Sequence, residues 1–293
     1  MSGPMARIEE LRREALIRLR ANRIEEAFPL LDEAMSLATD EATRELLTID
    51  RAQALILLER TGPEVQQLPA IIMRRRSAGH VYRAAYHLQY HFQNEKNYKR
   101  AQSYALIALG AAEEAGNAEW IREVKFALGN LAVLESRTSE AIDYYEAIFD
   151  EFPDNAEHRI WRAFTLQNLG YSRMMNDEVA RGIELIHRAL EMMVACGAAG
   201  YAAESYVDLC FGYLELGDLD AAERYGELGL AEATETRQVR NAHYLLGEVA
   251  YKKGDTAKAE SHFEHLATFY PDFPQLKNLL LAIDLRGLVN LKL

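Results

Sequence analysis

The chain has 293 residues, of which 49% are hydrophobic and 27% are charged, a balance that excludes a disordered polypeptide. The formal net charge of -12 disfavours nucleic acids and anionic membrane surfaces as partners, because an acidic surface repels phosphate groups. No apolar run approaches the roughly 20 residues that cross a bilayer. Cys196 and Cys210 lie among apolar or small residues, which favours reduced thiols and a cytoplasmic location.

The first 81 residues show helical spacing without a clear repeat. Residues 1–4, Met-Ser-Gly-Pro, are expected to be a cloning remnant, with Met5 as the natural start. Residues 5–81 are expected to form degenerate helix pairs. Pro63 and Pro69 interrupt the second half of this region, so we predict an irregular pair there.

A clearer pattern repeats from residue 82 to residue 273. Its apolar anchor residues are separated by 40, 41, 40 and 37 positions and are Leu88, Leu128, Leu169, Leu209 and Leu246. In the last repeat, Gly247 allows close helix contact, Gly254 ends the first helix, Ala259 is small where the helices cross, and Pro271 stops the second helix. Each repeat therefore predicts two helices joined by a tight turn.

This succession of helix pairs resembles the tetratricopeptide repeat (TPR), whose usual period is about 34 residues. The longer spacing adds nearly one turn to each helix, at about 3.6 residues per turn, and is similar to the repeats of adaptor and signal-transducing TPR proteins. The resemblance implies an all-α, right-handed α-solenoid of antiparallel helix pairs, with about seven repeats including the irregular pair. Each pair would bury one face on its neighbour.

Residues 274–293 follow the last repeat and are expected to form a C-terminal capping helix and tail. The segment from Gln275 to Leu288 carries an apolar stripe that would cover the last repeat. The final residues, Leu-Val-Asn-Leu-Lys-Leu, are more apolar than a solvent-facing cap should be. They are predicted either to fold back on the last pair or to contact another chain, through self-association or a partner.

In the TPR family the first helix of each pair lines the concave surface, and the resemblance implies the same role for the matching positions here. These positions combine aromatic side chains, which offer large contact area, with amides that donate to and accept from a peptide backbone. Acidic members toward the C-terminal half favour a partner segment with some positive charge. The candidate peptide- or partner-binding residues are Arg83, Tyr86, His87, Tyr90, Asn94, Phe126, Asn130, Gln167, Asn168, Tyr171, Asp208, Phe211, Tyr244 and Glu248.

These residues also have a purely structural interpretation. Tyrosines at helical spacing pack between adjacent helix pairs, and a buried amide such as Asn130 or Asn168 is satisfied either by a neighbouring helix or by a ligand. The sequence also departs from TPR proteins that grip C-terminal carboxylates with clamp lysines. The corresponding positions hold Tyr86, Phe126, Gln167, Val207 and Tyr244.

The sequence shows no catalytic motif: a Gly-rich phosphate loop, a nucleophile elbow and a His-Glu-x-x-His helix are all missing. His87, His91 and Glu95 have the spacing of metal ligands, but three ligands on one helix make a weak site. We therefore expect no metal, no cofactor and no enzymatic activity.

The function predicted from these features is a cytoplasmic, non-enzymatic scaffold or adaptor that binds a peptide or protein segment in its concave groove. The alternative is a regulatory sensor that binds a small ligand or signalling peptide and controls a partner protein. A thermal shift with a small molecule or short peptide would favour the sensor, because an adaptor needs a macromolecule.

Overall fold

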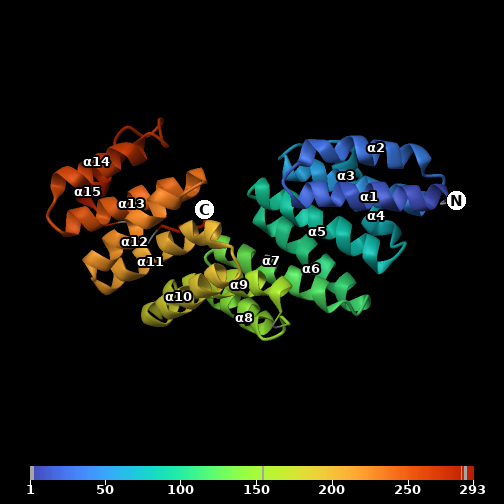
Figure 1. The fold of residues 1–293 in the computed structure, drawn as a ribbon. Helices are drawn as coiled ribbons and strands as arrows, with labels where there is room; N and C mark the ends of the chain where they lie inside the picture. Colours follow the sequence, from blue (N-terminus) through green and yellow to red (C-terminus); the bar gives the residue numbers. More distant parts are fainter. Residues whose placement is uncertain (1–2, 154, 285, 287–288) are drawn as a thin grey trace. The chain divides into compact units, whose positions relative to one another are not determined.

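The computed structural model describes residues 3–153, 155–284, 286 and 289–293. Within these residues the chain is all-α, with no β-strand and no helix that is long and apolar enough to cross a membrane. Successive helices form antiparallel pairs, so the predicted fold class is confirmed (Figure 1). The chain divides into two compact units, Met1–Leu131 and Ala132–Leu293, which are described one at a time.

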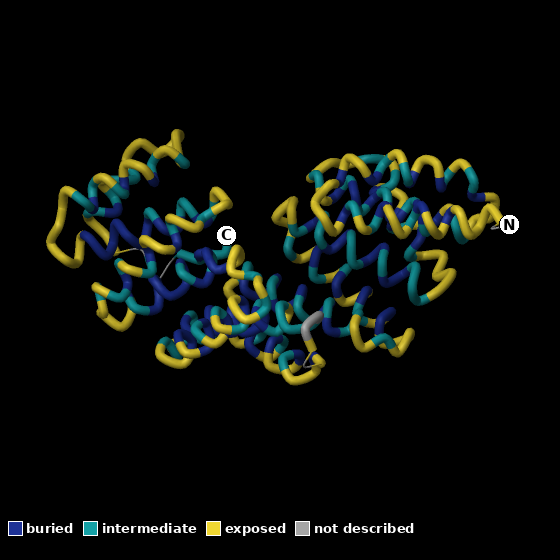
Figure 2. Tube along the Cα trace, viewed as in Figure 1, coloured by how far each residue is buried: buried dark blue, intermediate teal, exposed yellow. Residues whose placement is uncertain are grey.

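Unit 1 contains three complete helix pairs and most of the first helix of a fourth. Its helices are α1 (Pro4–Arg20), α2 (Ala27–Leu37), α3 (Glu41–Leu57), α4 (Pro63–Arg74), α5 (Ala78–Asn94), α6 (Tyr98–Glu114) and α7 (Ala118–Leu134), with a short 3-10 helix at Ile24–Glu26. Buried and exposed residues alternate along its helices, so each helix has a buried side and an exposed side (Figure 2).

Local sequence explains where several of these helices begin. The Asp40 carboxylate accepts a hydrogen bond from the Thr43 amide at 2.8 Å, and the Asn97 side chain accepts one from the Arg100 amide at 3.3 Å. Such caps satisfy backbone donors that the first helical turn leaves unpaired. Pro63 lies at the start of α4, where its missing amide costs nothing, and Pro69 lies inside the same helix without ending it. The expected irregular pair is therefore an antiparallel pair, α3 and α4.

Unit 2 contains the end of α7 and the remaining helix pairs. Its helices are α8 (Thr138–Phe149), α9 (Ala156–Met174), α10 (Val179–Ala195), α11 (Ala202–Leu216), α12 (Leu219–Glu232), α13 (Thr236–Lys252), α14 (Thr256–Ala267) and α15 (Leu276–Ala282), with a 3-10 helix at Ala199–Tyr201. Helices α9, α11 and α13 each pack on the helix that follows them, and α11 also packs directly on α13. The first helices of consecutive pairs therefore lie side by side.

Small residues allow the paired helices of unit 2 to approach closely. A Cβ atom at Gly247 would lie only 2.6 Å from Cδ1 of Phe263, which is fully buried on α14. Ala259 on the same helix is also fully buried. Gly254 has a left-handed φ of 81° just after α13, a conformation that glycine adopts without strain. The predicted roles of Gly247 and Gly254 are confirmed, whereas α14 ends at Ala267, before Pro271 is reached.

The expected capping helix is shorter than its sequence predicts. The apolar stripe indicated a helix from Gln275 to Leu288, but α15 ends at Ala282 and Ile283 has extended backbone with φ of -139°. Leu280 is buried, whereas Ile283 is half exposed. Leu288 lies outside the described residues.

Candidate functional site

The first helices of three successive pairs in unit 2 direct polar side chains to one shared face. All of these side chains contact residues 290–292, near the end of the sequence. They are Tyr171 on α9, Glu204 and Asp208 on α11, and Arg237 and Asn241 on α13. We call this set the α9–α11–α13 face. The end of the chain, marked C in Figure 1, lies beside it.

The backbone of Leu291 is held from both sides on this face. Its amide donates to the Tyr171 hydroxyl at 3.1 Å. Its carbonyl accepts from Asn241 Nδ2 at 2.5 Å and from Arg237 at 3.2 Å. The Leu291 side chain is 2% exposed, so the face combines backbone recognition with an apolar anchor site.

Lys292 completes a buried charge cluster. Its ammonium donates to Asp208 Oδ1 at 2.7 Å and Oδ2 at 2.8 Å, and also to Glu204. It lies 4.4 Å from the centre of the Tyr171 ring, within the range of a cation–π contact. Arg237 pairs with Glu204 at 2.8 Å. Two cations therefore balance two carboxylates in a site shielded from water.

Burial and charge act in opposite directions on the two carboxylates. Burial raises the pKa of Asp208 to about 6, although the nearby Lys292 lowers it. Burial also opposes ionisation of Glu204, but the charges of Lys292 and Arg237 prevail and lower its pKa to about 2. The two groups share one ammonium and titrate as a pair. Glu204 stays ionised, whereas the charge of Asp208 depends more on the ammonium of Lys292.

Asn290 fixes the segment at its other end. Its Nδ2 donates to the Val133 carbonyl at 2.7 Å and contacts Ser136 Oγ at 3.3 Å, while its Oδ1 accepts from the Tyr171 hydroxyl at 3.2 Å. The tail was expected to fold back on the last pair or to contact another chain. Within the described residues it folds back, but it reaches α9 and the end of α7 as well as α13.

The structure brings some of the predicted unit 2 residues together and separates others. Tyr171 and Asp208 belong to the α9–α11–α13 face, and Gln167 Nε2 lies 3.5 Å from Asp208 Oδ2. The ring of Phe211 lies 6.4 Å from that of Tyr171. Asn168 instead hydrogen-bonds to the buried Tyr145 hydroxyl on α8, so a neighbouring helix satisfies this amide.

Tyr244 and Glu248 lie one turn apart on α13 and form a different environment. Both are buried, and the Tyr244 hydroxyl and Glu248 Oε1 have no hydrogen-bond partner among the described residues. Burial raises the pKa of Glu248 to about 7, helped by the negative charge of Asp284 and opposed by Arg286 and Lys252.

The predicted residues of unit 1 gather on α5 and α7. The Tyr86 and Tyr90 hydroxyls lie 3.3 Å apart, and the Asn94 amide donates to the Ile56 carbonyl at 3.4 Å. Burial, followed by the charge of Arg83, lowers the pKa of His87 to about 3, so this imidazole is neutral at physiological pH. The remaining two, Phe126 and Asn130, are partly buried on α7.

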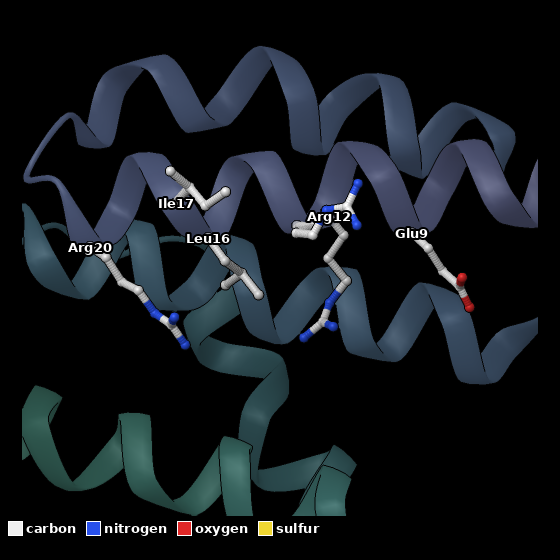
Figure 3. A pocket seen from close by; sticks show the side chains of 6 residues that line it. Glu9, Arg12, Leu16, Ile17 and Arg20 are labelled. Carbon is white, nitrogen blue, oxygen red and sulfur yellow. The ribbon is translucent and has the colours of Figure 1, made fainter. Parts of the chain in front are cut away.

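Charged side chains of the first helices also meet in unit 1. Arg12 on α1 pairs with the buried Asp50 on α3. One side of α1 lines a pocket of about 250 Å³, where Arg12 and Arg20 extend beside Leu16 and Ile17 (Figure 3). In the described part of the chain, no three His, Cys, Asp or Glu residues gather in a metal-binding group.

Sequence reasoning missed the segment that lies on the site. The candidate set omitted Asn290, Leu291 and Lys292, as well as Glu204 on α11 and Arg237 and Asn241 on α13. A signal was present, since the final residues are too apolar for a cap and include one lysine, while the acidic face predicted a positively charged partner segment. Nothing in the repeat pattern connected the two.

No protein-family model matches the sequence, and no curated protein is significantly similar to it. Solved structures of similar fold include NprR in complex with its cognate peptide NprX, with TM-score 0.72, 14% identity, and coverage of 95% of this chain and 81% of NprR. A Rap protein complexed with competence and sporulation factor has TM-score 0.71 and 16% identity, over 94% of this chain and 78% of Rap.

A third similar structure is a STAND protein with a tetratricopeptide repeat sensor, PH0952 from Pyrococcus horikoshii. Its TM-score is 0.69 with 17% identity, over 94% of this chain and 44% of the STAND protein. At these identities the likeness concerns the fold. The chain therefore has the fold of TPR proteins, as its repeats predicted.

Proposed function

We propose that the chain is a non-enzymatic interaction scaffold that holds a peptide or protein segment on the α9–α11–α13 face. The observation that carries this proposal is that both the backbone amide and the backbone carbonyl of Leu291 are hydrogen-bonded to the face. The face supplies an acceptor for a backbone amide and donors for the adjacent carbonyl. Contacts of this kind recognise a polypeptide backbone whatever its side chains. The cytoplasm is the compartment we propose for it.

The comparisons support the same function by analogy. NprR binds its cognate peptide NprX, and a Rap protein binds competence and sporulation factor. Proteins of this fold therefore include binders of peptides, although fold by itself does not determine function. The other predicted residues, including those on α5 and α7, are proposed to provide further binding surface in the unit to which each of them belongs.

Affinity purification from the native host, followed by mass spectrometry, tests this proposal. The variant Arg237→Ala/Asn241→Ala removes the donors to the backbone carbonyl. We expect this variant to recover at least about 90% less of any partner that the unaltered chain enriches. A loss of roughly 1.4 kcal/mol of binding free energy lowers the affinity tenfold. The matched control is Glu184→Ala/Arg188→Ala, which alters exposed residues of α10. Equal recovery with both variants would contradict the assigned site.

A regulatory sensor is the second candidate, favoured by the likeness to NprR with its bound peptide. The sensor would pass a binding signal to a partner protein. A thermal shift with a short peptide or small molecule in the absence of any other protein supports the sensor, because a ligand that binds the native state raises its stability. A shift that requires a macromolecular partner supports the adaptor.

A further inference from the structure

Residues 290–293 form a turn that the α9–α11–α13 face holds as it would hold a ligand. The Leu293 amide donates to the Asn290 carbonyl at 3.2 Å, and the Lys292 amide donates to Asn290 Oδ1 at 3.0 Å. Asparagine is favoured in such turns because its side chain bonds to the backbone two residues further on. The turn places Leu291 and Lys292 at its tip, where both meet the face.

We propose that this face recognises a short turn-forming segment of a partner protein in which Asn, an apolar residue and Lys follow one another, and that residues 290–293 occupy the same site as a built-in competitor. The proposal rests on the proposed function and names the chemistry of its ligand.

The charge of the face requires a cation in the position of Lys292. The Asp208 side chain is 1% exposed and receives both of its short contacts from the Lys292 ammonium, with Gln167 Nε2 at 3.5 Å as a longer one. Arg237 is already paired with Glu204. Removal of Lys292 would leave a buried carboxylate without a counter-ion, which is costly. The ligand that replaces the turn must therefore bring its own positive charge.

Lysine fits this position through its ring contact as well as its charge. The Lys292 side chain is 12% exposed, and its ammonium lies over the Tyr171 ring while it contacts the two carboxylates. The position before the lysine must be apolar, because Leu291 is buried. The position after the lysine is less restricted, because the Leu293 side chain is half exposed. Leu293 contributes its backbone oxygen, which accepts a hydrogen bond from Arg240 at 2.6 Å.

The built-in turn controls access because it belongs to the same chain. A tethered segment competes at an effective concentration of about the millimolar range, without needing high intrinsic affinity. A partner segment of the same chemistry must displace it, so weak partners are excluded. A change that releases residues 290–293 should therefore raise the affinity of the face for an added peptide.

Fluorescence anisotropy with a labelled Val-Asn-Leu-Lys-Leu peptide tests the proposal on the full chain. The variant Lys292→Glu places a carboxylate against Asp208 and Glu204 and should release the built-in turn. We expect it to bind the peptide at least about tenfold more tightly than the unaltered chain does. A second variant, Leu291→Asp, should give the same gain by removing the apolar anchor. The control Lys99→Glu matches the net charge change on an exposed part of α6 and should bind as the unaltered chain does.

The outcomes separate this proposal from the proposed function. Equal affinity for the unaltered chain and both release variants overturns the built-in competitor. If a Val-Asn-Leu-Glu-Leu peptide binds with the same affinity as the Val-Asn-Leu-Lys-Leu peptide, the lysine requirement is overturned. If no chain binds the peptide but partner capture still needs Arg237 and Asn241, the ligand chemistry proposed here is wrong and the scaffold function stands. Light scattering could also show that the unaltered chain is a dimer and that Lys292→Glu dissociates it. The turn would then occupy the face of a second copy, and the proposal would be overturned.

Discussion

Replacing Arg12 with Met is expected to lower the free energy of unfolding by about 3–5 kcal/mol, the usual cost of breaking a buried ion pair by removing one partner. Arg12 on α1 donates from Nη2 to Asp50 Oδ1 at 3.1 Å and from Nε to Asp50 Oδ2. The Asp50 side chain on α3 is 1% exposed. Burial raises the pKa of this carboxyl, while Arg12 and Arg83 favour its ionised form. Without the Arg12 guanidinium, Asp50 must either remain charged in a dry site or take up a proton.

Chemical denaturation followed by far-ultraviolet circular dichroism measures this effect. The double variant Arg12→Met/Asp50→Leu should recover most of the loss, because an apolar pair leaves no buried charge. The single variant Arg13→Met changes an exposed neighbour on α1 and should stay within about 0.5 kcal/mol of the unaltered chain. An Arg12→Met loss no greater than that of Arg13→Met would show that the ion pair does not stabilise unit 1.

Replacing Glu248 with Gln is expected to stabilise the chain by about 2 kcal/mol at pH 8 and by little at pH 4.5. The folded pKa of Glu248 is about 7, above its ordinary value of 4.5. Between these values the folded chain keeps a proton that the unfolded chain has released, so stability falls as pH rises through this window. The full shift corresponds to more than 3 kcal/mol at about 1.36 kcal/mol per pKa unit, and screening by solvent reduces it.

The measurement is the difference in unfolding free energy between Glu248→Gln and the unaltered chain, taken at both pH values. Taking the difference cancels the titration of groups that do not interact with Glu248. The exposed Glu232 provides the control, and its Gln variant should stay within about 0.5 kcal/mol of the unaltered chain. A Glu248→Gln difference that does not change with pH would contradict the raised pKa.

The repeat architecture was predictable because steric requirements recur at fixed positions. Gly247 must be small to admit Phe263, and Ala259 is fully buried on the facing helix, so small residues recur at related positions from residue 82 to residue 273. The end of a helix at Gly254 follows from local chemistry alone. Such constraints act within a pair and therefore remain visible in the order of residues.

The occupied face was not predictable in the same way. Leu291 and Tyr171 are 120 positions apart, and their contact follows no period. The ion pair between Arg12 and Asp50 likewise joins separate helix pairs across 38 positions. The binding roles of the candidate residues stay predictions, and the structure adds the partners that surround them. For Asn168 this partner is a neighbouring helix, which was one of the two alternatives that the sequence left open.

Amide hydrogen exchange of residues 289–293 in the full chain tests most directly whether the α9–α11–α13 face holds a polypeptide segment. The amides of Leu291, Lys292 and Leu293 are all hydrogen-bonded in the structure. They should exchange at least about tenfold more slowly than in the free Val-Asn-Leu-Lys-Leu peptide, since exchange then requires the segment to detach. Tyr171→Phe, which removes the acceptor for Leu291, should speed the exchange. Exchange at the rate of the free peptide in the unaltered chain would contradict the account.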